Sequence, residues 1–249
     1  MPRLLTESRK HSDREVSSAY EPDRVAGRPE REYEELHHAE KITSLPDEEI
    51  TLAETLKQHG YATANYGKAH LRKDPKTYGF DEAITGWVKS YYHPFGREYD
   101  KSLPANEGDY YTDKLTDAAI DFIEQNKDQP FFVHLEHFSV HDPIQGRKDL
   151  VRKYEKKLAA MPRQEGPDFI LEPNPDGPAF TEDELRDLEE DDTSETHQGD
   201  RVWWVKQKQD NIEFAGMVEA TDQSLGRIRA KLKELGLEKN TIIIFTADN

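Results

Sequence analysis

Three short polar segments of the sequence carry side chains that could bind an anion and a metal ion. Residues 67–70 (GKAH) and 139–143 (SVHDP) supply a lysine and histidines, and residues 246–249 (TADN) end in a carboxylate and an amide. Lysine and histidine hydrogen-bond to anionic oxygens, whereas aspartate and asparagine oxygens suit hard cations such as Ca²⁺ and Mg²⁺. These residue types match what a tetrahedral oxyanion beside a hard cation requires.

Each of these residues also has a plainer interpretation. Lys68 could be a solvated surface lysine, and His141, which precedes Asp142 and a proline, could be a turn histidine. Asp248 and Asn249 could form no more than a turn after a buried strand. The chemical interpretation therefore depends on whether the fold brings the three segments together.

Each segment follows a predicted strand, which itself follows a predicted helix. Three such units in succession favour an α/β fold with a mostly parallel sheet and helices on both faces. Parallel sheets bind ligands beyond the carboxyl ends of their strands, so the three segments should converge at one edge. The predicted units are a helix from Glu49 to Gly60 with a strand at 61–66, a helix from Asp109 to Pro130 with a strand at 131–138, and a helix at 214–236 with a strand at 241–245.

A cluster of histidines offers a zinc site as an alternative. His134, His137 and His141 lie close together in the sequence. Side chains alternate along a strand, however, and this alternation places His134 and His137 on opposite faces. The spacing therefore favours zinc less than it favours an anion site.

Composition narrows the class of partner. Lys and Arg number 34 against 51 Asp and Glu, a net charge of −17, which repels nucleic acid and anionic lipid alike. No cysteine is present, which excludes disulfides and a cysteine nucleophile within these residues. Neither a signal peptide nor a membrane-spanning run is visible. We expect no nucleic-acid or membrane partner.

The chain divides by composition into an irregular polar segment at 1–47 and an α/β domain at 48–249. An acidic insertion at about 146–209 interrupts this domain. Its acidic run could bind calcium weakly, but it lacks the spaced ligands and glycine of a calcium loop. A solvated surface helix and loop is the favoured interpretation of this acidic run, residues 182–192.

Four stretches of the sequence resemble the sulfatase family of the alkaline-phosphatase-like superfamily. Residues 51–63 (TLAETLKQHGYAT) with 67–71 (GKAHL) are similar to the second sulfatase signature, in which only a tryptophan is replaced by Ala69. Residues 78–81 (YGFD) resemble the G-F-D turn that follows it. Residues 130–133 (PFFV) with 140–143 (VHDP) resemble the P-F-F strand and H-x-P segment, and 222–249 resembles the stretch that ends in S-D-N-G. The resemblance covers Leu45 to Asn249 apart from the insertion and implies a partial alkaline-phosphatase-like fold.

The resemblance assigns a role to each candidate residue. Lys68 and His70 would contact the sulfate and the nucleophile, and His141 would bind sulfate or protonate the leaving alcohol. Asp248 and Asn249 would ligate Ca²⁺. The implied activity is that of a sulfuric ester hydrolase, of the arylsulfatase or N-acetylgalactosamine-6-sulfatase type, acting on a sulfate ester of a carbohydrate. The parent protein would be periplasmic or secreted.

The family nucleophile is missing from this sequence. Sulfatases use a formylglycine made from Cys or Ser in a C/S-x-P/A-x-R segment, and no such segment occurs here. We therefore expect a middle section of a sulfatase that is inactive by itself. A phosphodiesterase relative remains an alternative because lysine, histidine and a hard metal also serve phosphate. A non-catalytic remnant that binds an anion is a second alternative.

The 249-residue chain should not hydrolyse p-nitrophenyl sulfate, with or without calcium. The family route needs a nucleophile that adds to sulfur, and no Cys or suitably placed Ser can become one. Release of p-nitrophenol by the purified chain measures this directly. Turnover above the buffer rate that disappears in a His141→Ala variant would contradict the prediction.

Overall fold

A computed structural model describes residues 44–46, 48–69, 73–86, 88–96, 102–162, 164–173, 181, 183 and 202–247. Nearly all of the polar segment 1–47 therefore lies outside the described residues. Two compact units are present: the larger consists of Glu40–Asp168 with Lys206–Asn249, and the smaller includes the described residues 169–173 and 202–205. The elements are α1 (Leu52–Gln58), β1 (Ala62–Gly67), η2 (Pro75–Tyr78), β2 (Glu82–Thr85), α2 (Tyr111–Gln125), β3 (Phe131–Glu136), α3 (Lys148–Ala160), β4 (Phe169–Pro173), β5 (Val202–Lys206), α5 (Ile212–Glu234) and η3 (Glu238–Asn240).

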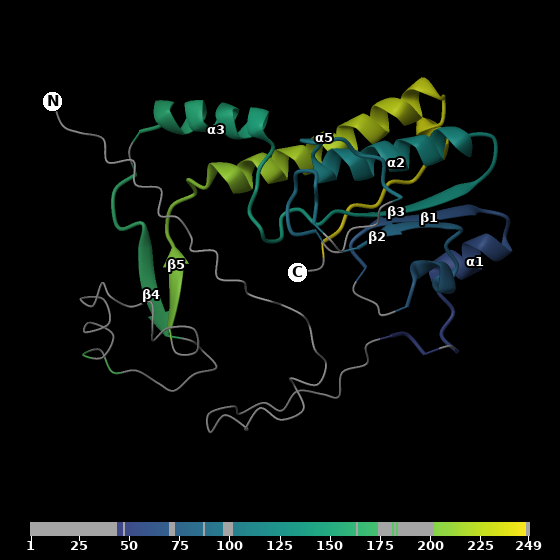
Figure 1. Cartoon of the computed structure of the whole chain (residues 1–249), viewed down its shortest axis with the longest axis horizontal. Coiled ribbons are helices and arrows are strands. Elements are labelled where there is room, and N and C mark those ends of the chain that lie inside the picture. The colour runs from purple at the N-terminus through teal and green to yellow at the C-terminus, as the bar shows by residue number, and fades with distance from the viewer. Residues whose placement is uncertain are drawn as a thin grey trace. The chain divides into compact units, whose positions relative to one another are not determined.

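The larger unit is built on a three-stranded parallel sheet in the order β2-β1-β3. The central strand β1 pairs with both neighbours, and Ala64 lies opposite Glu82 on one side and Val133 on the other. Helix α2 lies on one face of the sheet and α1 on the other (Figure 1). The predicted α/β class, with parallel strands and helices on both faces, is confirmed.

Local sequence explains why the chain turns from α1 into β1. Thr51 and Glu54 form a capping box in which Thr51 Oγ1 accepts from Glu54 N at 3.1 Å and Glu54 Oε2 accepts from Thr51 N at 2.8 Å. The helix ends before Gly60, whose φ of +83° is a left-handed conformation that glycine adopts without strain. The predicted helix, glycine joint and strand are all present.

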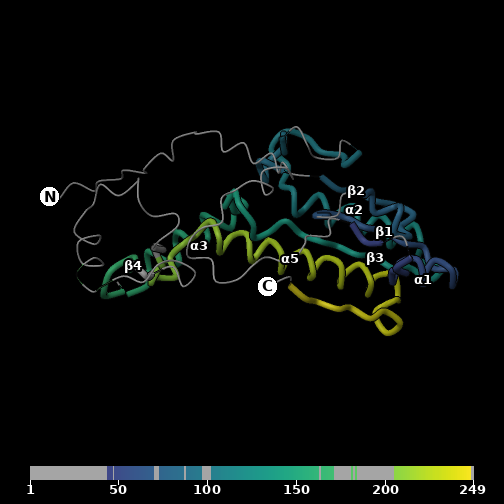
Figure 2. The backbone as a smooth tube through the Cα atoms, turned by 90° about the horizontal axis from the view of Figure 1, so that it is seen from below, coloured from purple at the N-terminus to yellow at the C-terminus, as the bar shows by residue number. Residues whose placement is uncertain are grey.

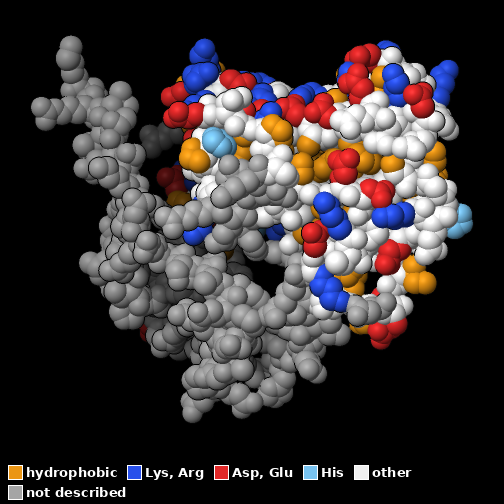
Figure 3. Space-filling view, turned by 45° about the vertical axis from the view of Figure 1, so that its right-hand side comes forward, with side chains coloured by type: hydrophobic (Ala, Val, Ile, Leu, Met, Phe, Trp, Pro, Cys, Tyr) orange, Lys and Arg blue, Asp and Glu red, His pale blue; other side chains and the backbone are white. Residues whose placement is uncertain are grey.

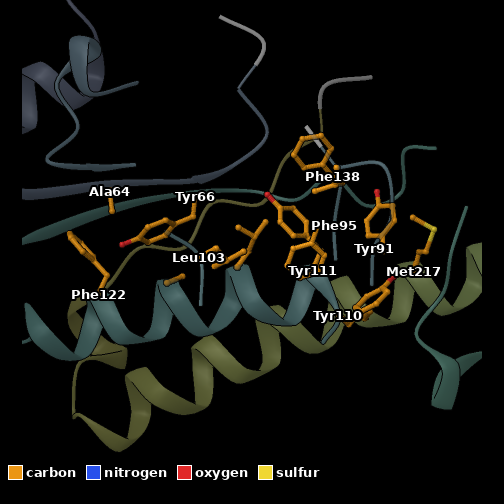
Figure 4. Close-up of a cluster of buried hydrophobic side chains, with 14 of the residues drawn as sticks. Ala64, Tyr66, Tyr91, Phe95, Leu103, Tyr110, Tyr111, Phe122, Phe138 and Met217 are labelled. Atoms are coloured by element: carbon orange, nitrogen blue, oxygen red, sulfur yellow. The ribbon is translucent and has the colours of Figure 1, made fainter. Parts of the chain in front are cut away.

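Aromatic side chains dominate the core between the sheet and α2 (Figure 4). Tyr66 from β1 meets Phe122 from α2 edge to face at 6.2 Å between ring centroids. The ring of Tyr111, at the start of α2, packs against those of Phe95 and Phe138, with centroid distances of 4.9 Å and 5.7 Å. Because Phe138 lies just after β3, this packing also fixes the start of the loop that leaves the sheet.

Helix α5 is joined to α2 and to the end of β3 by buried polar groups. The hydroxyl oxygens of Thr116 in α2 and Ser224 in α5 are 2.7 Å apart, and His137 Nε2 lies 2.9 Å from Ser224 Oγ. His137 Nδ1 is buried without a hydrogen-bond partner in the described structure. Burial disfavours the imidazolium and lowers the pKa of His137 to about 4, so the ring is neutral near pH 7.

Helix α3 falls inside the segment that the sequence assigned to the insertion, yet it packs on α5. Leu150 is buried, and Lys153 Nζ lies 2.7 Å from Glu219 Oε2 of α5. On the face seen in Figure 3, acidic and basic side chains of the described residues are interspersed. The larger unit thus continues to Asp168, beyond the predicted start of the insertion at residue 146. The insertion boundaries at about 146–209 stay a prediction.

The prediction of a strand at 241–245 is wrong. Residues 241–247 belong to no strand, and Ile242, Ile244 and Phe245 are 90%, 83% and 75% exposed. The segment follows η3 and runs back in the direction opposite to α5 (Figure 2). A continuously apolar sequence becomes a buried strand only where a neighbouring strand pairs with its backbone. Among the described residues, no strand pairs with this segment.

The free energy of unfolding should depend on pH through the titration of His137. The pKa of His137 is about 4 in the folded chain and about 6.5 after unfolding. Between these two pH values the unfolded chain therefore binds a proton that the folded chain does not. Stability is therefore unaffected by this group above about pH 6.5 and falls as the pH drops toward 4. The expected loss between about pH 7 and pH 5 is about 2 kcal/mol, measured by urea unfolding.

The variant His137→Asn keeps a polar group near Ser224 but cannot titrate, so its stability should lose this pH dependence. The control is His59→Asn, at the exposed end of α1, which should keep the wild-type slope. An unchanged slope in His137→Asn would contradict the assignment.

The exposed apolar segment at 241–245 should drive self-association. Replacing Ile244 with lysine puts a charge in the middle of this segment, where it opposes both apolar contact and strand pairing. Sedimentation velocity over a range of concentrations should show less association for Ile244→Lys than for wild type. Gln129→Lys adds the same charge at another exposed position and should behave as wild type. Equal association of all three chains would refute the prediction.

Candidate active site

Lys68 lies immediately beyond β1, and its backbone is tied to the neighbouring strand. Its N–H donates to the carbonyl oxygen of Glu136, the last residue of β3, at 3.0 Å. The preceding Gly67 has a φ of +116°, and a Cβ atom there would lie 1.8 Å from the same oxygen. Only glycine fits this close approach, which explains why a glycine precedes the lysine. Lys68 itself is half-buried.

His141 lies in the loop that follows β3, and its side chain is exposed. Its backbone N–H donates to Phe138 O at 2.7 Å, which forms a turn. The ring atom Nδ1 lies 3.0 Å from Asp142 O. A carbonyl oxygen only accepts, so this contact requires the hydrogen on Nδ1 and leaves Nε2 available to another molecule. When neutral, Nε2 accepts a proton; when protonated, it donates to an anion.

The two described candidates follow strands that are parallel neighbours. Gly67 at the end of β1 lies opposite Glu136 at the end of β3, so Lys68 and the loop of His141 both leave the sheet at its carboxyl edge. The remaining candidates, His70, Asp248 and Asn249, lie outside the described residues. The structure thus places Lys68, and the start of the loop that carries His141, at the edge where parallel sheets bind ligands. Their chemical roles stay predictions.

The three histidines considered for zinc have different surroundings. His134 Nδ1 lies 2.8 Å from Asn65 Oδ1 on the sheet, whereas His137 lies against Ser224 of α5. His134 and His137 thus lie against different parts of the fold, as predicted, although His137 follows the last residue of β3 rather than alternating within it. Within the part of the chain that the structure describes, no group of three or more His, Cys, Asp or Glu side chains could hold a metal ion.

A set of tyrosines that the sequence analysis did not identify holds the loop of His141. Tyr91 Oη donates to His141 O at 3.0 Å, and Tyr110 Oη donates to Gln145 O at 2.8 Å. Tyr92 Oη donates to Gly146 O at 3.1 Å. The only signal in the sequence is the local density of tyrosine at 91–92 and 110–111, which does not reveal the partners some 35 to 54 residues away.

Comparison with known proteins identifies the family. The family model named Sulfatase matches residues 3–249. An uncharacterised sulfatase of Schizosaccharomyces pombe is 28% identical over 245 residues, and an arylsulfatase of Klebsiella aerogenes is 26% identical over 231 residues. Both matches cover 82% of this chain, and they cover 41% and 48% of those relatives.

A third relative has a more specific name. The N-acetylglucosamine-6-O-sulfatase of Bacteroides thetaiotaomicron is 25% identical over 256 residues, which is 84% of this chain and 45% of that protein. The chain therefore spans less than half the length of each of these relatives. No helix among the described residues combines the length and the apolar composition needed to cross a membrane.

The family-model match extends over nearly the whole chain, and it agrees with the GKAHL and VHDP segments and with the parallel α/β sheet. Sulfatases are sulfuric ester hydrolases, and the family is generally metal-dependent. The chain belongs to the sulfatase family.

Proposed function

We propose that this chain forms part of a sulfuric ester hydrolase that acts on sulfated carbohydrate. The observation that carries the proposal is the position of Lys68 and His141 after paired parallel strands at one edge of the sheet. Family membership supplies the reaction class, and the position of the two segments after neighbouring strands supports a role for their polar side chains in binding sulfate.

Lys68 and His141 would serve different steps of ester cleavage. The ammonium group of Lys68 would bind the sulfate oxygens, whose negative charge must be stabilised while the nucleophile adds to sulfur. His141 would bind sulfate or protonate the leaving alcohol through Nε2, because Nδ1 already donates to Asp142 O. A protonated His141 favours both of these actions, so the proposed role requires the imidazolium form.

A sulfated carbohydrate is the proposed substrate class. The name of the Bacteroides relative specifies the 6-O-sulfate of an amino sugar, although the arylsulfatase relative shows that the family includes other sulfate esters. His70, two residues after Lys68 in the GKAHL segment, would also contact the sulfate by the family resemblance. Export of the parent protein to the periplasm or medium is part of the proposal and rests on the family resemblance.

Calcium is the proposed metal, with Asp248 and Asn249 among its ligands. When bound, a hard cation would offset the negative charge of the sulfate and the nucleophile. These two residues offer at most about three oxygens, whereas Ca²⁺ takes about six to eight. Among the residues that the structure describes, no cluster of carboxylates adds further ligands, so the proposal names only these two.

Sulfate binding by the 249-residue chain tests the proposal without requiring turnover. Inorganic sulfate, added at constant pH, should shift the NMR signals of Lys68 and His141. Lys68→Ala should weaken binding about tenfold or more, because it removes a charge-assisted hydrogen bond. Lys76→Ala, which removes an exposed lysine in η2, is the matched control and should bind as wild type.

Substrate class is tested with N-acetylglucosamine 6-sulfate in the same titration. The sulfated sugar should bind more tightly than either inorganic sulfate or the unsulfated sugar, because it combines the anion with the sugar ring. Binding of inorganic sulfate without any gain from the sugar would favour a simple anion-binding remnant. Failure of sulfate to shift either residue would overturn the proposed site.

A further inference from the structure

We propose that Tyr91 is a positioning residue for His141, and that its hydroxyl group sets the orientation in which the imidazole meets the sulfate group. This inference rests on the proposed function of His141. Tyr91 is some 50 residues from His141 in sequence and lies outside all the motifs that identify the family.

The contact between the two residues is direct and buried on the tyrosine side. Tyr91 Oη donates to the carbonyl oxygen of His141 at 3.0 Å, and Tyr91 is 0% exposed. Its ring stacks with that of Tyr110 at 5.8 Å between centroids. Burial is the largest influence on the pKa of Tyr91 and raises it well above the usual value, against a hydrogen bond from Ser139 that lowers it. The hydroxyl therefore stays protonated and remains a donor at any physiological pH.

A second set of hydrogen bonds holds the other end of the same loop. Gln145 Oε1 accepts from Tyr91 N at 2.8 Å and from Ser90 Oγ at 3.2 Å. Tyr110, the residue before α2, donates its hydroxyl to Gln145 O at 2.8 Å. Residues 141–145 are thus held at both ends by Tyr91, once through its side chain and once through its backbone.

No helix or strand among the described residues orients the imidazole. The residues between β3 and α3 form no helix or strand, and the side chain of His141 is exposed. The ring is oriented by the contact of Nδ1 with the next carbonyl, Asp142 O, at 3.0 Å. Because that carbonyl belongs to the backbone that Tyr91 holds, a shift at His141 O also moves the acceptor of Nδ1. The hydroxyl of Tyr91 therefore acts on the imidazole through the backbone.

The variant Tyr91→Phe removes this hydroxyl and keeps the ring in the core. Tyr66→Phe is the matched control, since Tyr66 is also buried and donates its hydroxyl to Glu82 Oε2 at 2.9 Å, away from the loop. NMR of the histidine ring nitrogens reports which nitrogen of His141 carries the hydrogen in the neutral form. A parallel titration with inorganic sulfate reports affinity.

Wild type and Tyr66→Phe should show the hydrogen of neutral His141 on Nδ1 and should bind sulfate equally. Tyr91→Phe should shift the tautomer population toward Nε2–H and weaken sulfate binding about fivefold to tenfold, as loss of one hydrogen bond to the site predicts. If Tyr91→Phe does not fold, as judged by circular dichroism, Tyr110→Phe replaces it, because it removes another tyrosine hydroxyl that binds the loop, at Gln145 O. The same tautomer shift and loss of affinity are expected.

The outcomes separate this inference from the proposed function. If wild type fails to bind sulfate, the proposed function fails, and the tautomer of His141 still tests the positioning role. If wild type binds sulfate and the tyrosine variant retains both its affinity and its tautomer, the positioning role is refuted and the proposed function stands. A loss of affinity with an unchanged tautomer would also refute it, because the effect would not pass through the imidazole.

Discussion

The parallel pairing of β1 with β3 is the constraint on which the candidate site depends. This pairing continues past the last residue of β1, where the N–H of Lys68 donates to Glu136 O. Gly67 makes the approach possible because a side chain at that position would collide with the same carbonyl oxygen. One hydrogen-bonded ladder thus fixes the start of both polar segments. Without it, the positions of Lys68 and the His141 loop would be independent of each other.

Where the hydrogen bonds between β1 and β3 end, aromatic packing and tyrosine hydroxyl groups hold the loop that carries His141. Tyr111 and Phe138 pack together at the start of the loop, and Tyr91 and Tyr110 bind its backbone further on. Aromatic residues suit this task because a ring buries a large apolar area while its hydroxyl satisfies a carbonyl that has left the sheet. The exposed His141 is therefore supported by a core that it does not itself enter.

Features with local causes could be predicted from the sequence. The capping box at Thr51 and the left-handed Gly60 determine the α1 to β1 unit from adjacent residues, and the branched and aromatic residues of β3 likewise predict a strand. The residues 241–245 have an equally clear strand pattern but no strand that pairs with them among the described residues. The apolar pattern of these residues indicates that they suit a buried strand, but it does not show which strand would pair with them.

Features with distant causes could not be predicted. The predicted insertion begins at about residue 146 on composition alone, which does not reveal that α3 packs on α5, where Lys153 pairs with Glu219. The hydrogen bond from Tyr91 to His141 joins residues that no short motif contains. Of the candidate site, the sequence identified Lys68 and His141 from their place after predicted strands, whereas their supports depend on three-dimensional contacts.

Hydrogen exchange of the Lys68 amide tests the central claim most directly. If the β1 to β3 ladder extends past Gly67, this amide should be protected to a degree similar to the amides within β1, because its hydrogen is bonded to Glu136 O. Exchange is measured by NMR on the native chain after transfer to deuterated buffer. Exchange at the rate of an unstructured peptide, while the amides of β1 remain protected, would contradict the account.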